Sequence, residues 1–540
     1  MHKAATISSS AARVLILLVC GCAFGQQLLQ VENAASLLTG DISAGSLARL
    51  QLIYQGGPIT PIDPVTVSAQ LLPMGLQDPL PLSVLHVLDA TSVLVLIPGA
   101  TPLGPASITL SFNGQNSPSQ SVNIVATSFG LYSAGTGEAA LAQNITSNGL
   151  QLNNLTHPAH PQDFVTLWGT GLGAATADQV TVLVGGQPFP VTYAGPSADF
   201  AGLDQINFQV PDDPSIPQSC YVAVNVEIGN TISNLATLSL SQDDGPCAHP
   251  FGLTADELAQ LDSGGQVYVG QIDLYSTIGA PPSSLYSPAY VRMESGQARF
   301  LTYNASSLSI ISGPLFADDY LVGCNSSGGA TARVLAVSNS LNVGNQVTIQ
   351  GPGGQELTLL PQGQNPLLAY SGAEPAAPVV TNPDQLPAPF FSTGQWQASA
   401  PGNSIVEPFT AMLSIPNPIQ ITNIGHVTMV DHTQDLTIAW DTTTYSGADY
   451  VYVQLFSQIP SVLYVSSSAV LCQVPATAGQ ATIPAALLAS FQPSATATLS
   501  LSISRKPGTA GLFSIGLNDG TSIPSVFQYY SAEVIEVQFQ

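Results

Sequence analysis

The residues best suited to metal chemistry lie close together in one short stretch. His157, His160 and Asp163 occur in the segment THPAHPQDF. Imidazole and carboxylate groups are common ligands of transition metals. Prolines flank them, however, and the sequence names no further ligands to complete a coordination shell. We therefore favour a polar inter-strand loop over a metal site.

A second group consists of four aspartates around one expected strand. They are Asp199, Asp204, Asp212 and Asp213. Hard oxygen ligands on neighbouring loops are suited to calcium, which stiffens tandem extracellular sandwiches, so we keep the four as calcium candidates. No EF-hand spacing is present. The commoner explanation is that acidic loop ends keep a nearly lysine-free surface soluble. Apart from calcium, the sequence predicts no cofactor.

The sequence shows no catalytic constellation. The nucleophile elbow G-x-S-x-G, the zinc motif H-E-x-x-H and a Cys–His pair with an orienting group are all missing. Asp318 and Asp319 are adjacent, so in a strand their side chains point to opposite faces. We predict that the protein is not an enzyme. A glycosidase pair assembled from distant loops remains the alternative.

The glycine run Gly169–Gly173 (GTGLG) invites a nucleotide-binding interpretation. Its spacing is not G-x-G-x-x-G, and a strand follows it where a phosphate-binding helix would be needed. We therefore interpret these glycines as turn residues with positive φ.

Three tryptophans could stack on sugar rings, namely Trp168, Trp396 and Trp440. In β-sandwiches a tryptophan more often belongs to the core, and we favour that interpretation.

The first 25 residues have the character of a signal peptide. A short basic start precedes the apolar run VLILLVCGCAF, and Ala23-Phe24-Gly25 predicts cleavage before Gln26. We expect a secreted or cell-surface protein. A lipoprotein acylated at Cys22, or a periplasmic protein, is the alternative. The run is too short for a permanent span, and no later segment predicts a transmembrane anchor.

Four cysteines follow the signal segment: Cys220, Cys247, Cys324 and Cys472. In an oxidising compartment they allow three pairings. We favour a Cys220–Cys247 disulfide, because these residues bracket one pair of strands. Cys324 and Cys472 either bridge two domains or stay free. The absence of a Cys-x-x-Cys pair argues against zinc.

The composition excludes several classes of partner. Only 8% of the 540 residues are charged, and the formal net charge is −25. So acidic a surface repels nucleic-acid backbones and anionic lipids. An unidentified protein or glycan remains the expected partner. High glycine and proline content with ample Val, Leu and Ile indicates an all-β protein with many turns.

Short apolar runs near ten residues apart predict tandem immunoglobulin-like and fibronectin-like β-sandwiches with a few short helices. One helix is expected after Thr254, where Thr-Ala-Asp-Glu fits a capping box. We divide the chain into a signal peptide (1–25), a first immunoglobulin-like sandwich (26–127), a second immunoglobulin-like sandwich (128–242), a helical connector (243–264), a β-rich domain (265–370), a proline-rich linker and strap (371–425) and a fibronectin-like C-terminal sandwich (426–540). Through Asn33-Ala-Ala-Ser36 and Ile42-Ser-Ala-Gly-Ser46, the first sandwich resembles the immunoglobulin-like, plexin-type (IPT) class.

Several short motifs in the second sandwich carry a family resemblance. They are FVTLWGTGLG from Phe164, VGG from Val184, YAG from Tyr193 and GLDQINFQVP from Gly202. In this order they resemble the Solibacter-type C-terminal domain, an uncharacterised module of secreted acidobacterial proteins related to immunoglobulin-like, plexin-type domains. Asp204 stands where that family often has an aromatic residue. The resemblance implies a fold and an exported location, and it brings no established activity.

The sequence therefore predicts an exported multi-domain β-sandwich protein that acts as a non-catalytic interaction module at a surface or in a matrix. The alternative is a carbohydrate-binding or carbohydrate-active protein with its site in residues 247–368.

Overall fold

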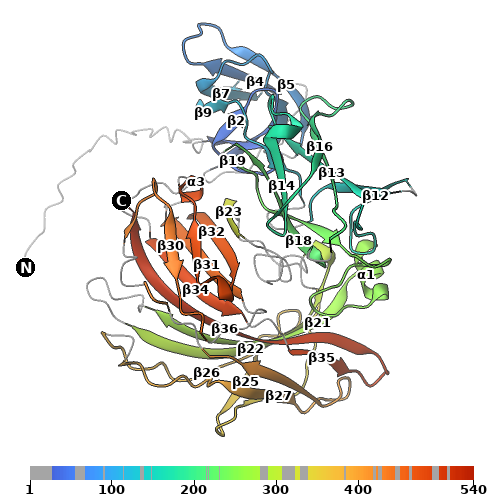
Figure 1. Cartoon of the computed structure of the whole chain (residues 1–540), viewed down its shortest axis with the longest axis vertical. Coiled ribbons are helices and arrows are strands. Elements are labelled where there is room, and N and C mark those ends of the chain that lie inside the picture. Colours follow the sequence, from blue (N-terminus) through green and yellow to red (C-terminus); the bar gives the residue numbers. More distant parts are fainter. Residues whose placement is uncertain are drawn as a thin grey trace, which may run out of the picture.

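The structure is a computed structural model, and it confirms the all-β fold class: two β-sandwiches in tandem precede a C-terminal unit built on one large sheet (Figure 1). It describes residues 27–54, 67–88, 92–112, 115–133, 139–146, 149–213, 216, 218–229, 231–279, 290–306, 323–328, 338–381, 385–417, 421–423, 429–443, 450–460, 465–488, 498–506 and 511–539. The expected signal peptide and Asp318-Asp319 lie outside these residues.

The first sandwich closes around a core of aliphatic side chains from its own strands, among them Leu50, Val93 and Ile108, all fully buried. Its nine-stranded sheet follows the order β1-β3-β6-β5-β4-β7-β9-β2, with β8 paired to β7. The strands are β1 (Gln27–Asn33), β2 (Asp41–Ser43), β3 (Leu47–Tyr54), β4 (Val67–Pro73), β5 (Leu80–Val87), β6 (Ser92–Leu96), β7 (Gly104–Phe112), β8 (Gln115–Asn116) and β9 (Gln120–Val125).

The second sandwich packs two sheets around one core, in which valines of β14 and β18 meet Ile206 and Phe208 of β17. One sheet has the order β12-β11-β13-β17-β16 with β10 beside β13, and the other β15-β14-β18-β19 with β20 beside β18. The strands are β10 (Gly130–Leu131), β11 (Ala142–Thr146), β12 (Gly149–Leu152), β13 (Phe164–Thr170), β14 (Val180–Val184), β15 (Gln187–Phe189), β16 (Val191–Pro196), β17 (Asp204–Gln209), β18 (Ser219–Ile228), β19 (Thr231–Ile232) and β20 (Ala236–Leu240), with a 3-10 turn at Ala177–Gln179.

The connector contains the expected helix, α1 (Ala255–Asp262). Thr254 Oγ1 accepts from Glu257 N, and Glu257 Oε2 accepts from Thr254 N at 2.7 Å, which completes the capping box. Leu258 and Leu261 are buried beneath it. They belong to a core that also contains side chains of β18 and of the C-terminal strands, so the connector joins the second sandwich to the rest of the chain.

A disulfide links Cys247 in this connector to Cys220 in β18. This is the pair favoured from the sequence. Cys472 is also disulfide-bonded. Directly opposite it, in the ladder between β23 and β32, stands Cys324.

The C-terminal part forms one unit around a large sheet of 14 strands, in the order β23-β32-β31-β34-β36-β21-β22-β26-β25-β24-β27-β28 with β29 and β35 beside β36. Its strands are β21 (Val267–Gly279), β22 (Val291–Tyr303), β23 (Gly323–Gly328), β24 (Val347–Gln350), β25 (Glu356–Gln362), β26 (Ala369–Ala373), β27 (Gly394–Ala400), β28 (Phe409–Ile415), β29 (Met429–Val430), β31 (Tyr450–Pro460), β32 (Val465–Pro475), β34 (Thr498–Lys506), β35 (Gly511–Gly516) and β36 (Ser522–Phe539). A smaller sheet pairs β30 (Leu436–Ala439) with β33 (Gln480–Ile483), near a 3-10 turn (Ala476–Ala478) and helix α3 (Ala485–Leu488).

Two of the expected divisions need correction here. The segment 371–425, expected to be a linker and strap, contains β27 and β28, which pair with each other and, through β27, with β24. Residues 265–370 and 426–540, expected to be separate, share one sheet because β21 pairs in parallel with β36. A local pattern marks each strand but does not say which distant strand it will meet, so this pairing was not readable from the sequence. The other boundaries stay predictions.

Candidate functional site

The four aspartates considered for calcium do not come together. Asp204 begins β17, whereas Asp212 and Asp213 follow the opposite end of that strand. Asp199 is exposed in the preceding loop. Eight residues of extended chain separate Asp204 from Asp212 by about 26 Å. Within the described ranges, no three His, Cys, Asp or Glu side chains form a group that could hold a metal ion.

Asp204 instead fastens the glycine-rich segment of its own sandwich. Its side chain is nearly buried, and Oδ2 accepts from Leu172 N at 2.7 Å. Burial raises the pKa of this carboxyl to about 6, although the backbone N–H groups of Leu172 and Gly171 oppose the rise. The carboxylate is therefore a structural acceptor at the end of β13.

This raised pKa predicts an unusual pH dependence of stability. The folded state binds the Asp204 proton more tightly than the unfolded state, whose pKa is near 3.8, so this group's stabilisation is greatest in acid and is lost as the pH rises through about 6. Between pH 5 and pH 7.5 the loss is about 1.4 kcal/mol for these two pKa values. Asp204→Asn keeps an acceptor for Leu172 and should remove this slope. Urea unfolding of both proteins at the two pH values measures it.

The comparison between the two proteins is needed because buried His249 acts in the opposite direction. Burial lowers its pKa to about 3, so acid destabilises the fold through this residue, equally in wild type and variant. The same pH slope in both proteins would contradict the assignment to Asp204.

The histidine loop is held by hydrogen bonds within the protein. His160 N donates to Asp163 Oδ2 at 2.9 Å, and His160 Nδ1 lies 3.0 Å from Ser241 O. Asn154 Oδ1 accepts from His157 N at 2.8 Å. These side-chain and backbone groups thus form hydrogen bonds that hold the loop in place, in keeping with the polar inter-strand loop favoured from the sequence.

The glycine run Gly169–Gly173 lies against the segment that joins the first two sandwiches. A Cβ added to Gly169, Gly171 or Gly173 would lie 2.0–2.4 Å from the carbonyl oxygens of Gly130, Ser128 and Ala126, in that order. Because every second residue of the run is a glycine, every second carbonyl group of the joining segment can lie close to the backbone of the run. Gly171 and Gly173 also have positive φ, as expected for turn glycines.

Side-chain contacts complete this junction, which we call the interdomain clamp (residues 126–130 against 169–173, with Asn33 and Thr170). Asn33 Nδ2 donates to Ser128 O at 2.8 Å and to Thr170 O at 3.2 Å. Thr170 Oγ1 accepts from Leu47 N at 2.8 Å and donates to Gly202 O at 2.6 Å. The first and second sandwiches are therefore joined by buried polar contacts.

The tryptophans divide into two kinds. Trp396 and Trp440 are buried in separate cores, and their Nε1 groups donate to Ser392 O and Ala476 O. Trp168 is only partly buried, on β13, between buried Leu167 and Gly169. The core interpretation thus holds for two tryptophans, and Trp168 lies on the outward face of its sheet.

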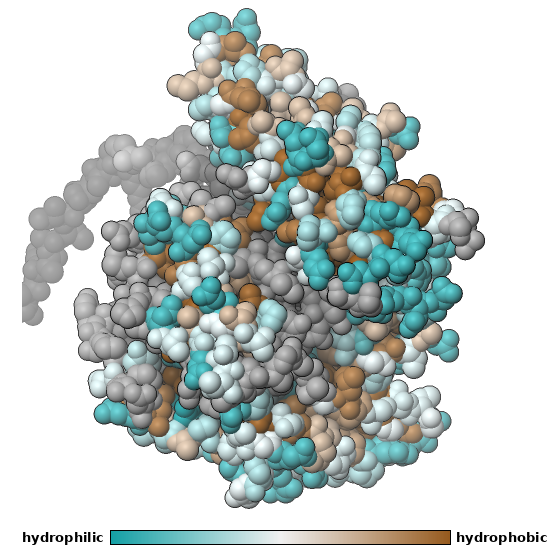
Figure 2. Space-filling model, viewed as in Figure 1, coloured by the Kyte–Doolittle hydropathy of each residue, from teal (hydrophilic) through white to brown (hydrophobic). Residues whose placement is uncertain are grey.

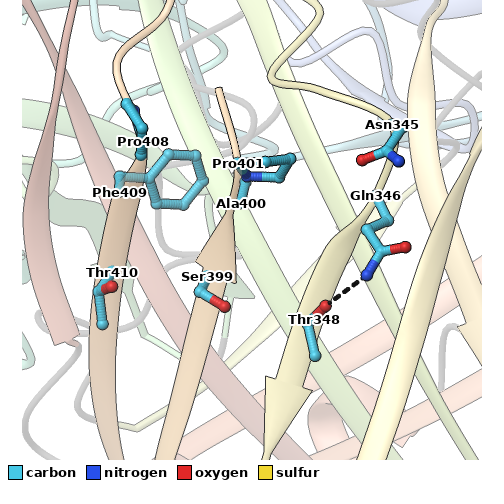
Figure 3. A pocket seen from close by; sticks show the side chains of 9 residues that line it. All are labelled: Asn345, Gln346, Thr348, Ser399, Ala400, Pro401, Pro408, Phe409 and Thr410. Atoms are coloured by element: carbon cyan, nitrogen blue, oxygen red, sulfur yellow. Dashed lines mark hydrogen bonds between the residues drawn. The ribbon is translucent and has the colours of Figure 1, made fainter. Parts of the chain in front are cut away.

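A pocket of about 470 Å³ opens on the outward face of the C-terminal sheet (Figure 3). Thr348, Ser399 and Thr410 lie side by side in register on β24, β27 and β28. Gln346 Nε2 donates to Thr348 Oγ1 at 3.0 Å. The remaining lining residues are Asn345, Ala400, Pro401, Pro408 and Phe409. This volume falls in the range of small-ligand sites.

The rim of this pocket is held by hydrogen bonds between the loops around it. Tyr370, which is fully buried, accepts from Val343 N at 2.9 Å and its hydroxyl lies 2.9 Å from Gly344 O. Asn403 Nδ2 donates to Asn342 O at 2.6 Å, which ties the loop after β27 to the loop before β24. The hydroxyl row is therefore presented on a rigid support, as ligand recognition requires.

The chemistry of the lining residues is uniform. They carry hydroxyl and carboxamide groups beside proline and phenylalanine, and none is acidic, basic or a thiol. A glycosidase needs two carboxyl groups that face each other across about 5–9.5 Å. The pocket can accept and donate hydrogen bonds to an uncharged ligand but supplies no acid or base.

The sequence did not identify this pocket, since alternating Thr and Ser residues are ordinary on the solvent side of a strand. Only the register of three strands, two of them in the supposed linker, brings the hydroxyls together.

Among the described residues, no helix is long and apolar enough to cross a membrane.

Comparison with known proteins gives a limited result. No family model matches the chain, and no curated protein does, so the resemblance to the Solibacter-type domain stays a prediction. Solved structures that are similar in part include domains 5–6 of the S-layer protein SbsC (12% identity, 40% of this chain and 99% of that one, TM-score 0.20), the Escherichia coli adhesin FdeC (11%, 73% and 98%, 0.13) and the titin tandem A164-A165 (10%, 41% and 99%, 0.13). At these TM-scores the similarity carries no argument about function.

Proposed function

We propose that the protein is an extracellular interaction module that binds its partner without chemical turnover. The observation that carries the proposal is the pocket on β24, β27 and β28, where an uncharged row of hydroxyl groups lies on a rigid sheet. Disulfides at Cys220–Cys247 and at Cys472 support an exported location, because such bonds persist in oxidising compartments.

A neutral saccharide is the ligand that the pocket favours. Thr348, Ser399 and Thr410 present hydroxyls, and Asn345 and Gln346 present carboxamides, which match the hydroxyl groups of a sugar. Pro401 and Pro408, both exposed, supply the apolar contact that a sugar ring also needs, whereas Phe409 lines the pocket but is buried in the core. Three of these residues lie in the region 247–368, where a carbohydrate site was the alternative prediction. A chain with 33 acidic residues has none in this pocket, which favours an uncharged ligand.

The test is a glycan array and a hydrolase screen with the full chain. We expect binding to uncharged glycans and a loss of at least tenfold in affinity for Ser399→Tyr, because the new ring fills the centre of the hydroxyl row. Gln395→Tyr is the matched control: Gln395 is exposed on the same face of β27 but does not line the pocket. Both variants should unfold at the wild-type temperature.

Two results would count against the proposal. Release of reducing sugar by the wild type would contradict binding without turnover. Equal binding by Ser399→Tyr and Gln395→Tyr would show that the ligand does not use this pocket.

A further inference from the structure

The second sandwich has one covered sheet and one open sheet. Along β18, nine of the ten residues are buried, so both faces of that sheet are in contact with other parts of the protein. Along β17, buried and partly exposed residues alternate strictly. The outward positions of the sheet β12-β11-β13-β17-β16 are therefore exposed or half-buried, except Thr166 and Gly195, which are buried. In Figure 1, β12, β13 and β16 lie at the right-hand side of this sandwich.

Aromatic rings occupy three positions of this open face, which we call the aromatic platform (the outward residues of β11, β12, β13, β16 and β17). Phe164 and Trp168 come from β13, and Tyr193 from β16. Phe164 is 38% exposed and Tyr193 40% exposed. Free aromatic rings on a rigid sheet are unusual on a monomer surface and mark contact sites.

The tyrosine lies flat because its neighbour is a glycine. A Cβ added at Gly195 would lie 2.8 Å from Tyr193 Oη and 3.1 Å from Cζ, so the ring covers the space that a side chain would fill. Tyr193 Oη donates to Pro196 O at 2.9 Å and holds the ring along its own strand. One face of the ring is thereby presented to solvent.

Carboxamides lie between the rings. The alternation of β17 turns Ile206 and Phe208 into the core and Gln205, Asn207 and Gln209 outward. Asn207 Oδ1 accepts from Thr166 Oγ1 at 3.0 Å and from Gln205 Nε2 at 2.9 Å, which fixes the orientation of its amide. The register places Gln205 directly beside Trp168, and Asn207 beside Tyr193.

The platform carries no carboxylate and no basic group on the five described strands. Its outward positions are Gln143, Ile145, Leu150, Leu152, Phe164, Thr166, Trp168, Tyr193, Gly195, Gln205, Asn207 and Gln209. In a chain of net charge −25, a face of this extent without charge matches an uncharged partner.

We propose that the aromatic platform is a second binding site, for a neutral polysaccharide chain. The C–H faces of pyranose rings pack on aromatic rings, while their hydroxyls take hydrogen bonds from carboxamides. Trp168 and Tyr193 are separated by two strand spacings and by two residues along the strands, about 12 Å in all, so they contact different rings of one chain. The site is open at both ends, which suits a long chain more than a single sugar.

The experiment uses the full-length protein with cellohexaose in calorimetry and with insoluble cellulose in a pull-down. We expect wild type to bind both, Tyr193→Phe to keep binding because it keeps the ring, and Tyr193→Ser to lose about tenfold. Trp168→Ala should lose at least tenfold. Leu360→Ala, at an exposed position outside both sites, is the control.

A fluorescence measurement on the wild type tests the same site without any variant, so its result does not depend on whether the variants fold. Trp396 and Trp440 are buried and hydrogen-bonded, so a change in wild-type tryptophan emission on addition of cellohexaose reports on Trp168. No emission change together with no binding of either probe would overturn the proposal. Wild-type affinity in Tyr193→Ser and Trp168→Ala would overturn it equally.

The outcomes separate this site from the pocket. The platform goes beyond the pocket but shares its ligand class, so Ser399→Tyr should leave platform binding intact. Binding lost in Ser399→Tyr and kept in the platform variants would support the pocket and overturn the platform; the reverse would support the platform alone. Self-association that Trp168→Ala abolishes, without saccharide binding, would replace the glycan by a second copy of the chain.

Discussion

Gly173→Ala is expected to destabilise the first two sandwiches by about 3 kcal/mol or more. The added Cβ would lie 2.0 Å from Ala126 O, which belongs to the backbone and has no rotamer to escape into. The φ of +64° adds about 1 kcal/mol for any residue other than glycine. Calorimetry of the full chain should show the earliest transition at lower temperature, and limited proteolysis should cut first between these sandwiches.

The matched control is Gly229→Ala. Gly229 has nearly the same φ, +59°, but a Cβ there would meet no atom within 4 Å. This variant should therefore pay only the conformational cost of about 1 kcal/mol. If both variants lost the same stability, the close approach between Gly173 and Ala126 would have no energetic role, and the interdomain clamp would be a loose contact.

Removing the Cys220–Cys247 disulfide is the second large effect that we expect. The bond closes a separation of 27 residues, and the chain-entropy relation gives about 3.5 kcal/mol for such a loop. Both cysteines are buried in the core that joins the second sandwich to α1 and the C-terminal unit. Cys220→Ala/Cys247→Ala should therefore lower the melting temperature of that junction, measured by calorimetry without reductant.

Chemical reduction of the wild type is the control, since it breaks the bond but keeps both sulfur atoms in the core. The two treatments should agree, apart from the packing lost with the sulfurs. Any reductant effect that persists in the double variant belongs to the disulfide of Cys472. An unchanged melting curve in the double variant would mean that the hydrophobic packing around Leu258 and Leu261 holds the junction by itself.

Local patterns in the sequence predicted local structure well. The capping box at Thr254 and the strands expected in the second sandwich are both present. Each is decided by residues a few positions apart, where hydrogen bonding and side-chain direction leave few choices.

Features that depend on distant strands were not predicted. The pocket requires Thr348, Ser399 and Thr410 to share one register, and a shift of one residue would turn a hydroxyl inward. The interpretation of the glycine run as turn residues with positive φ is confirmed for Gly171 and Gly173 but is wrong for Gly169, which belongs to strand β13. The partner of the run, the segment 126–130, was not foreseen. The aspartates near β17 show the same limit: nearness in sequence placed them at opposite ends of an extended strand.

The parallel pairing of β21 with β36 also sets the order in which the protein can be completed. Gly270 of β21 pairs with Ser525 of β36, so β21 is synthesised long before the strand with which it pairs. Until then β21 has an unpaired edge, and such edges favour aggregation. The two N-terminal sandwiches pair only among their own strands and can fold as they emerge. Folding of the C-terminal unit can therefore finish only after β36 has been made, and a chain shortened before β36 loses a central strand of its largest sheet.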